Sequence, residues 1–141
     1  MFARGRRLFT IASLTTILVA CLHAIGNSNT TPVDARQAAV IQAMTGYTIP
    51  LGMGMAPSFW GIFRVLVHTM TVTLVALGAV GLALAGDRQV AARVLRRVAV
   101  ILAIVSAVLS MVCYVHQIPP PLISFVVLVL LYGGAIFTTK D

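Results

Sequence analysis

The chain is organised as long, unbroken apolar runs separated by short polar segments. These runs lack the alternation of apolar and polar residues expected of half-buried strands, and they are too long for single strands. A helix needs roughly 20 apolar residues to cross a bilayer, where it satisfies its own backbone hydrogen bonds. We therefore predict four membrane-spanning helices, at residues 8–25, 59–85, 98–115 and 121–139.

The composition supports this interpretation. Sixty per cent of the 141 residues are hydrophobic, 9% are charged, and the mean hydropathy is +1.02. A soluble domain of this length would need more surface charge, so we expect one all-α membrane domain over residues 1–141. The net charge of +7 could suit nucleic acid, but the arginines cluster between the apolar runs. No nucleic-acid partner is expected.

Residues 18–21, Leu-Val-Ala-Cys, have the form of a bacterial lipobox. In that interpretation a signal peptidase removes residues 1–20, and Cys21 carries a lipid. The apolar run nevertheless continues past the cysteine to Ile25, and it is longer than the core of a typical signal peptide. We therefore expect a bacterial protein in which this segment is a retained membrane helix.

Positively charged residues set the predicted orientation, because they are enriched on the cytoplasmic side of membrane proteins. Three arginines near the N-terminus, four in the segment 86–97, and Lys140 would share one side. We predict a multi-pass protein of the bacterial cytoplasmic (inner) membrane with both termini in the cytoplasm. The segment 26–58 would be an outer loop, and 86–97 a cytoplasmic loop.

The cytoplasmic loop is expected to contact lipid. Asp87 would cap the third span, and the loop arginines would face membrane phosphates, with an acidic partner subunit as the alternative. These arginines are Arg88, Arg93, Arg96 and Arg97.

The outer loop is predicted to contain one amphipathic helix, at residues 32–45, lying on the membrane or over the spans. Thr31 would be its N-cap and Asp34 would complete a capping box, and Gly46 would end it. The following apolar segment, residues 47–58, is broken by proline and glycine and is expected to pack across the outer mouth of the bundle. Ser58 would cap the second span.

Small residues form stripes along the spans, and such stripes let helix backbones approach closely in lipid. They predict an antiparallel four-helix transmembrane bundle. The fourth span, at residues 121–139, has few small residues between 123 and 131 and is expected to be peripheral. The stripes are Ser13, Thr16 and Ala20; Gly78, Gly81 and Ala85; and Ala99, Ala103, Ser106, Ser110 and Cys113.

The predicted topology places every histidine and every cysteine in the outer half of the membrane or in the outer loop, and the same holds for every methionine after the first. Such side chains suit copper and zinc, and histidines can also hold haem, pigment or quinone. Alternatively, these residues fill packing gaps or, for the cysteines, form a disulfide between Cys21 and Cys113. The candidate metal ligands are Cys21, His23, Cys113 and His116. The candidate cofactor-binding residues are His23, His68 and His116.

Arg64 and His68 lie four residues apart within the second span and so share a helix face, with Thr71 one turn deeper. A cation inside a span is costly and tends to be functional or paired. Arg64 could extend outward to a lipid phosphate, or face inward and pair with Asp34 or an anionic headgroup. The predicted spans contain no acidic residue, so a carboxylate proton relay is not expected.

One stretch resembles a family of small, uncharacterised bacterial four-helix membrane proteins. Besides His23, the resemblance rests on Ala43-Met44, Tyr47, Gly54-Met55 and Ser58-Phe59, and it covers about residues 1–85. It implies the four-helix fold and transfers no activity. Arg64 and His68 depart from it, since that span would be more uniformly apolar in the family.

These features favour a non-enzymatic integral membrane subunit or scaffold, which packs against a larger membrane complex or against copies of itself. The chain has no Walker loop, dinucleotide fingerprint or favourable Ser-His-Asp arrangement. Two alternatives stay open. One is an outer-leaflet metal, haem, pigment or quinone site built from histidines, and the other is a small transporter or lipid-binding protein that uses Arg64.

Overall fold

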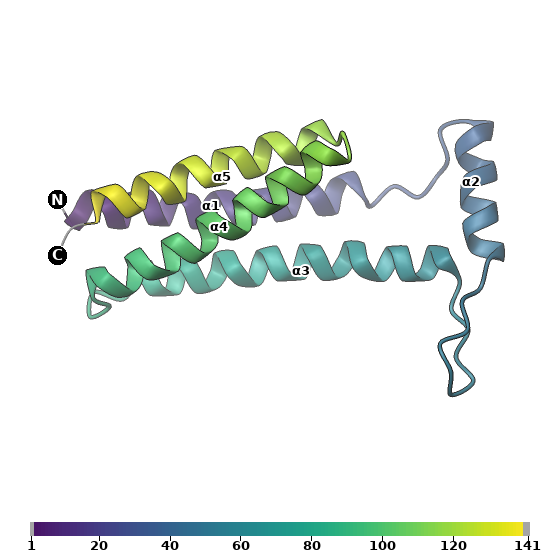
Figure 1. The fold of residues 1–141 in the computed structure, drawn as a ribbon, viewed down its shortest axis with the longest axis horizontal. Helices are drawn as coiled ribbons and strands as arrows, with labels where there is room; N and C mark the ends of the chain where they lie inside the picture. The colour runs from purple at the N-terminus through teal and green to yellow at the C-terminus, as the bar shows by residue number, and fades with distance from the viewer. Residues whose placement is uncertain (1, 140–141) are drawn as a thin grey trace. The chain divides into compact units, whose positions relative to one another are not determined.

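The computed structural model describes residues 2–139, which form five helices connected by short segments (Figure 1). They are α1 (Phe2–Gly26), α2 (Ala35–Gly46), α3 (Phe59–Gly86), α4 (Ala92–Val115) and α5 (Pro119–Thr138). All but α2 are long and apolar enough to cross a membrane. The chain is therefore an all-α, multi-pass membrane protein, as predicted. Lys140 of the predicted cytoplasmic set lies outside the described residues.

Two spanning helices begin well before their apolar runs. α1 begins at Phe2 and α4 at Ala92, so both helices include arginines near their first turns. The apolar run marks only the part that suits hydrocarbon, whereas a helix can continue into the interface, where arginine head groups reach water and phosphate. α5 also begins early, at Pro119, because proline is tolerated where backbone N–H groups have no partner within the helix.

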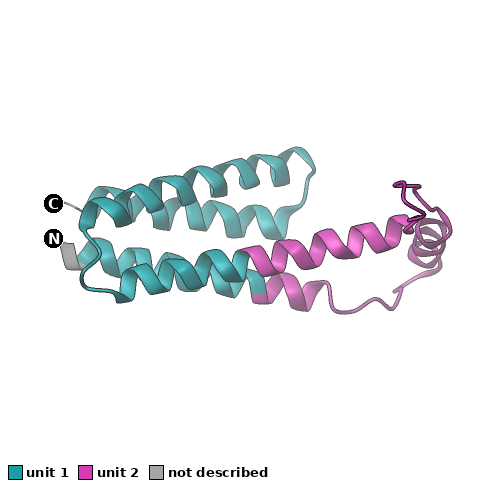
Figure 2. Ribbon diagram, turned by 90° about the horizontal axis from the view of Figure 1, so that it is seen from below, with its two compact units in different colours: residues 1–20, 74–141 teal, residues 21–73 magenta. Residues whose placement is uncertain are grey.

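The chain divides into two compact units (Figure 2). Unit 1 contains the chain up to Ala20 and from Leu74 onward, and unit 2 is Cys21–Thr73. Helices α1 and α3 each contribute residues to both units.

The core of unit 1 is built around α5, which packs against α4. Tyr132 is only 1% exposed, and its ring meets that of Phe9 edge to face at a centroid distance of 5.7 Å. Its hydroxyl lies 3.0 Å from Oγ1 of Thr16, whose own hydrogen is donated to the Ala12 carbonyl. Tyr132 is therefore the donor in this buried hydrogen bond.

The prediction that the fourth span is peripheral is wrong for this packing. Phe125 and Leu128 of α5 are as buried as Tyr132. The scarcity of small residues in this part of α5 therefore did not mean that its side chains are exposed to lipid.

Small residues bring the backbones of α1 and α3 into contact within unit 1. Ser13 is fully buried, and Gly78 is buried. A Cβ atom on Gly78 would lie 2.5 Å from Cγ1 of Ile17 and 2.9 Å from the Ser13 carbonyl oxygen. The predicted stripes on these helices are therefore packing surfaces. In α4 the stripe is buried at Ala99, Ser106 and Cys113 and only half-buried at Ala103 and Ser110.

Arg6 joins the start of α1 to the turn that follows α3. Its guanidinium donates hydrogen bonds to the carbonyls of Ala85, Asp87 and Val90, at 2.9, 2.6 and 2.8 Å. A Cβ on Gly5 would collide with Thr139, so the end of α5 lies here too. Both ends of the described chain and the α3–α4 turn therefore meet at one end of unit 1.

The prediction that Asp87 caps α4 is wrong. Its side chain accepts a hydrogen bond from the backbone N–H of Gln89, at 2.8 Å, and so stabilises the turn itself. The N-cap position of α4 is occupied by Ala91, which has no capping side chain. The tight turn after Gly86 uses the carboxylate before the helix begins.

In unit 2, α2 begins three residues later than predicted. Its N-cap is Asp34, which accepts from the Gln37 backbone N–H at 2.7 Å, while the Gln37 side chain accepts from Val33 N–H. Thr31 is therefore not the cap: its backbone N–H is held by the Asn29 side chain. α2 ends at Gly46 as predicted, and none of its residues is buried.

Between α2 and α3, residues 47–58 form a hairpin-like arm with short antiparallel bridges. We expected this segment to pack against the spans, but its tip is uncovered, since Met53 is 92% exposed. The arm ends at Ser58, whose hydroxyl accepts from the Gly61 N–H at 3.1 Å. This confirms Ser58 as the cap of α3.

Candidate functional site

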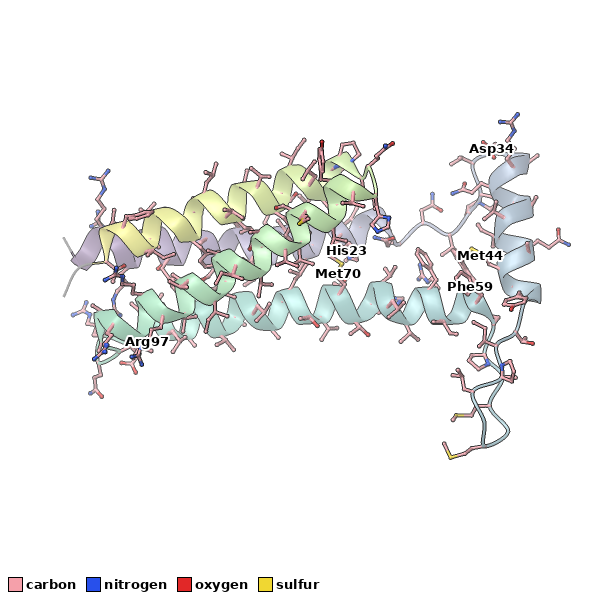
Figure 3. The ribbon with its side chains drawn as sticks, in the orientation of Figure 1. His23, Asp34, Met44, Phe59, Met70 and Arg97 are labelled. Atoms are coloured by element: carbon pink, nitrogen blue, oxygen red, sulfur yellow. The ribbon has the colours of Figure 1, made fainter. Side chains whose placement is uncertain are left out.

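Polar side chains gather in unit 2, where the last turns of α1 lie beside the first half of α3. Figure 3 shows His23 at this end of α1, close to Met70 of α3. The cluster contains His23, Asn27, Arg64 and Thr71. Its members come from α3, from the last turn of α1 and from the residue after α1, and the sequence analysis singled out His23, Arg64 and Thr71.

His23 is fixed by Thr71 rather than by another histidine. Its Nδ1 atom lies 2.8 Å from Oγ1 of Thr71, and that hydroxyl donates its hydrogen to the Val67 carbonyl at 3.2 Å. When the hydroxyl donates to Val67 it can only accept from His23, and Nδ1 of His23 then carries the hydrogen. In the neutral ring this places the lone pair on Nε2, the atom that could ligate a metal or accept a hydrogen bond.

Arg64 binds the end of α1. Its Nη1 atom donates to the Asn27 carbonyl at 2.7 Å, and the Asn27 side chain in turn donates to the His23 carbonyl at 2.8 Å. The hypothesis that Arg64 pairs with Asp34 is not supported, because the carboxylate of Asp34 caps α2. A cation at this position instead satisfies carbonyls that the helix end leaves without partners.

His68 shares the helix with Arg64 but not the cluster. Its Nδ1 atom lies 2.6 Å from the Arg64 backbone carbonyl, which can only accept, and its side chain is exposed. Spacing by four residues therefore joins the ring of His68 to the backbone of Arg64, not to its guanidinium. Nε2 of His68 is again the ring atom left for a ligand.

The remaining candidate ligands are in different surroundings. In unit 1, Cys113 is buried and His116, the C-cap of α4, is exposed. Cys21 of unit 2 is exposed, and both cysteines are free thiols, so the alternative of a Cys21–Cys113 disulfide is not formed in this structure. Across residues 2–139 there is no group of three or more His, Cys, Asp or Glu side chains placed to hold a metal ion.

The arginines of the predicted cytoplasmic loop lie on the surface of unit 1. Their side chains are all exposed, in the turn after α3 or on the first turns of α4 in unit 1. Phosphate binding by this set stays a prediction. The residues are Arg88, Arg93, Arg96 and Arg97.

Sequence reasoning missed Asn27 and the specific task of Arg6. Asn27 falls within the predicted outer loop, although glycine and asparagine are residues commonly found where a helix ends. Arg6 was counted only as one charge of the cytoplasmic set. Nothing in its local sequence indicates that it contacts residues about 80 positions away.

Chemically, the cluster offers hydrogen-bond donors and an imidazole nitrogen at the end of a span. The Arg64 fork has five N–H donors, and the structure gives one contact for it. Trp60 and Phe63 stack next to it in sequence, with ring centroids 5.5 Å apart. Such aromatic residues are typical of the membrane–water interface.

Comparison with known proteins does not extend these observations: no protein-family model, curated protein or solved structure matches the chain.

Proposed function

We propose that the chain is a non-enzymatic accessory subunit of a bacterial inner-membrane complex. Its four spans would form an antiparallel bundle, with both termini in the cytoplasm and the segment 26–58 outside. The family resemblance over about residues 1–85 is part of this proposal and assigns no activity.

The observation that carries the proposal is α2. This helix has 12 residues, none of them buried. A helix of this length is marginally stable in water by itself, because most helical stability in proteins comes from packing an apolar face. A surface outside this chain would therefore have to stabilise α2, and a partner subunit would supply one.

The surface of α2 suits an apolar partner. Val40 is 57% exposed, and Arg36 is the only charged residue in the helix. Beside it, Ala43, Met44, Tyr47 and Phe59 line a shallow groove, and Figure 3 labels two of them. An apolar side chain of a partner could fill this groove, as happens when helices dock by their apolar faces.

The contacts of Arg6 support the proposed topology. They hold the N-terminal end of α1 beside the α3–α4 turn, where the positively charged residues gather. A chain with four spans has this arrangement when both termini are on one side. The positive-inside rule then favours the cytoplasm for that side.

Affinity purification from native membranes in mild detergent tests the proposal. Wild-type chain should retain a larger membrane protein, and Val40→Glu should lose it, because a carboxylate cannot be buried in an apolar interface without a partner. Gln42→Glu, on the same exposed helix, is the matched control and should retain the partner. A wild-type chain that purifies alone and monomeric contradicts the proposal.

A second candidate function is supported by the hydrogen bonds of two histidines. Both His23 and His68 use Nδ1 in hydrogen bonds, which leaves Nε2 to bind haem or a metal in the manner of ligands oriented by their outer contacts. The absorption spectrum and metal content of the purified chain test this. A colourless, metal-free preparation would exclude it.

A further inference from the structure

The arm at residues 47–58 satisfies much of its own backbone. The N–H of Ile49 donates to the Pro57 carbonyl, Leu51 donates to Met55, and Met55 donates to Gly52, each at 3.0 Å. Pro50 and Pro57 have no N–H to satisfy. An irregular segment can lie against lipid only when its polar backbone groups are bonded or reach water, and this arm meets that requirement at the membrane interface.

The tip of the arm presents a bulky apolar side chain at an unusual backbone position. Met53 has a φ of 51°, in the left-handed region, between two glycines with φ of 84° and 76°. Long side chains rarely adopt this conformation. The turn holds Met53 outward with 92% of its surface exposed, and Leu51 and Met55 beside it are half exposed or more.

The arm and the sequence on either side of it carry no charge. No Asp, Glu, Lys or Arg occurs between Arg36 and Arg64. Protein partners are usually oriented by complementary charges and hydrogen bonds around an apolar centre, and this tip offers no charged group for that purpose. Lipid needs no such orientation, because apolar burial is non-directional.

The position of the arm also favours lipid. It is continuous with the first turn of α3, a spanning helix whose start carries the stacked Trp60 and Phe63. Within unit 2 the arm projects to the side of α3 rather than along its axis, and both Figure 1 and Figure 2 show this. A segment that leaves the end of a span sideways lies along the membrane surface.

We propose that residues 47–58 form a lipid anchor that inserts Leu51, Met53 and Met55 into the outer leaflet, at the boundary between headgroups and acyl chains. The unbranched methionine side chain adapts to irregular surroundings, which suits a fluid lipid surface. The arm acts independently of any partner that α2 binds.

Tryptophan fluorescence of the full chain in vesicles tests this proposal. Trp60 is the only tryptophan, so Trp60→Phe removes the native signal and keeps a ring beside Phe63. In that background, Met53→Trp is reconstituted into phosphatidylethanolamine–phosphatidylglycerol vesicles with ordinary or brominated acyl chains. We expect blue-shifted emission that loses intensity in the brominated vesicles.

The matched control is Thr30→Trp in the same background, at an exposed position of the polar linker. Its emission should stay red-shifted and unquenched. Quenching of Met53→Trp no greater than that of Thr30→Trp overturns the proposal. A blue shift that appears only after addition of a membrane-protein extract, without bromine quenching, also overturns it and indicates a protein partner. Partner-free vesicles keep this result separate from the α2 experiment.

Discussion

At the scale of single residues, Arg6 and Arg64 perform the same local task in different units. Each donates to carbonyl oxygens where a spanning helix ends: Arg6 at the end of α3, and Arg64 just after α1. These carbonyls lack partners within the helix and carry the negative end of the helix dipole. An arginine at such a position stabilises the protein as well as contributing to its charge distribution.

Arg6→Lys separates these two contributions. Lysine keeps the positive charge but lacks the planar fork that reaches three carbonyls. We expect unchanged membrane orientation and a loss of about 1.5–3 kcal/mol in the free energy of unfolding, the range for hydrogen bonds to charged groups. Arg7→Lys, at a neighbouring exposed residue, should have no effect. Chemical unfolding in detergent, followed by far-UV circular dichroism, measures both; equal stability of the two variants would contradict this role.

Gly78→Ala tests the close contact between α1 and α3. The added Cβ would meet the Ser13 backbone carbonyl, which cannot move aside as a flexible side chain could. Overpacking of this kind costs about 1–3 kcal/mol, so the variant should unfold at lower temperature in detergent. Gly133→Ala adds the same methyl group to α5 with no atom within 4 Å and should be neutral or slightly stabilising. A neutral Gly78→Ala would show that the helices are farther apart.

At the scale of elements, the sequence prediction and the structure differ in the residue that caps α2. The sequence predicts Thr31, and the structure has Asp34. Asp34→Ala should weaken the helix by about 1 kcal/mol, the usual cost of losing an N-cap, whereas Thr31→Ala should not. Because α2 contributes no buried residue, the effect should be local. Hydrogen exchange of the α2 amide groups, measured by mass spectrometry, is the appropriate assay. Faster exchange in Thr31→Ala than in Asp34→Ala would support the original capping assignment.

The apolar runs were sufficient to predict the four spanning helices, since length and hydrophobicity decide whether a helix suits a bilayer. They did not predict which helices contact which. The pairing of His23 with Thr71, and of Tyr132 with Thr16, depends on the register between separate spans. Apolar periodicity is uninformative about that register in lipid, where both the protein-facing and lipid-facing sides are apolar.

At the scale of the whole molecule, the buried core of unit 1 bears on the lipobox at residues 18–21. α1 continues through Cys21 without a break, and the part before the cysteine supplies many of the buried side chains. Cleavage after Ala20 would remove the partners of Tyr132 and leave its hydroxyl without an acceptor inside the core. The buried side chains that precede Cys21 in α1 are Phe9, Ala12, Ser13, Thr16, Val19 and Ala20.

We therefore expect residues 1–20 to stay attached and Cys21 to carry no lipid. Intact-mass spectrometry of the protein purified from bacterial membranes should show the first helix present and no added acyl mass. Cys21→Ser should change the mass only by the substitution and should leave membrane extraction unaltered, because the Cys21 side chain is exposed and its thiol is free. A mass reduced by the first 20 residues and increased by acyl chains, with both changes abolished in Cys21→Ser, would instead establish a lipoprotein. Unit 1 would then need another helix to cover Tyr132.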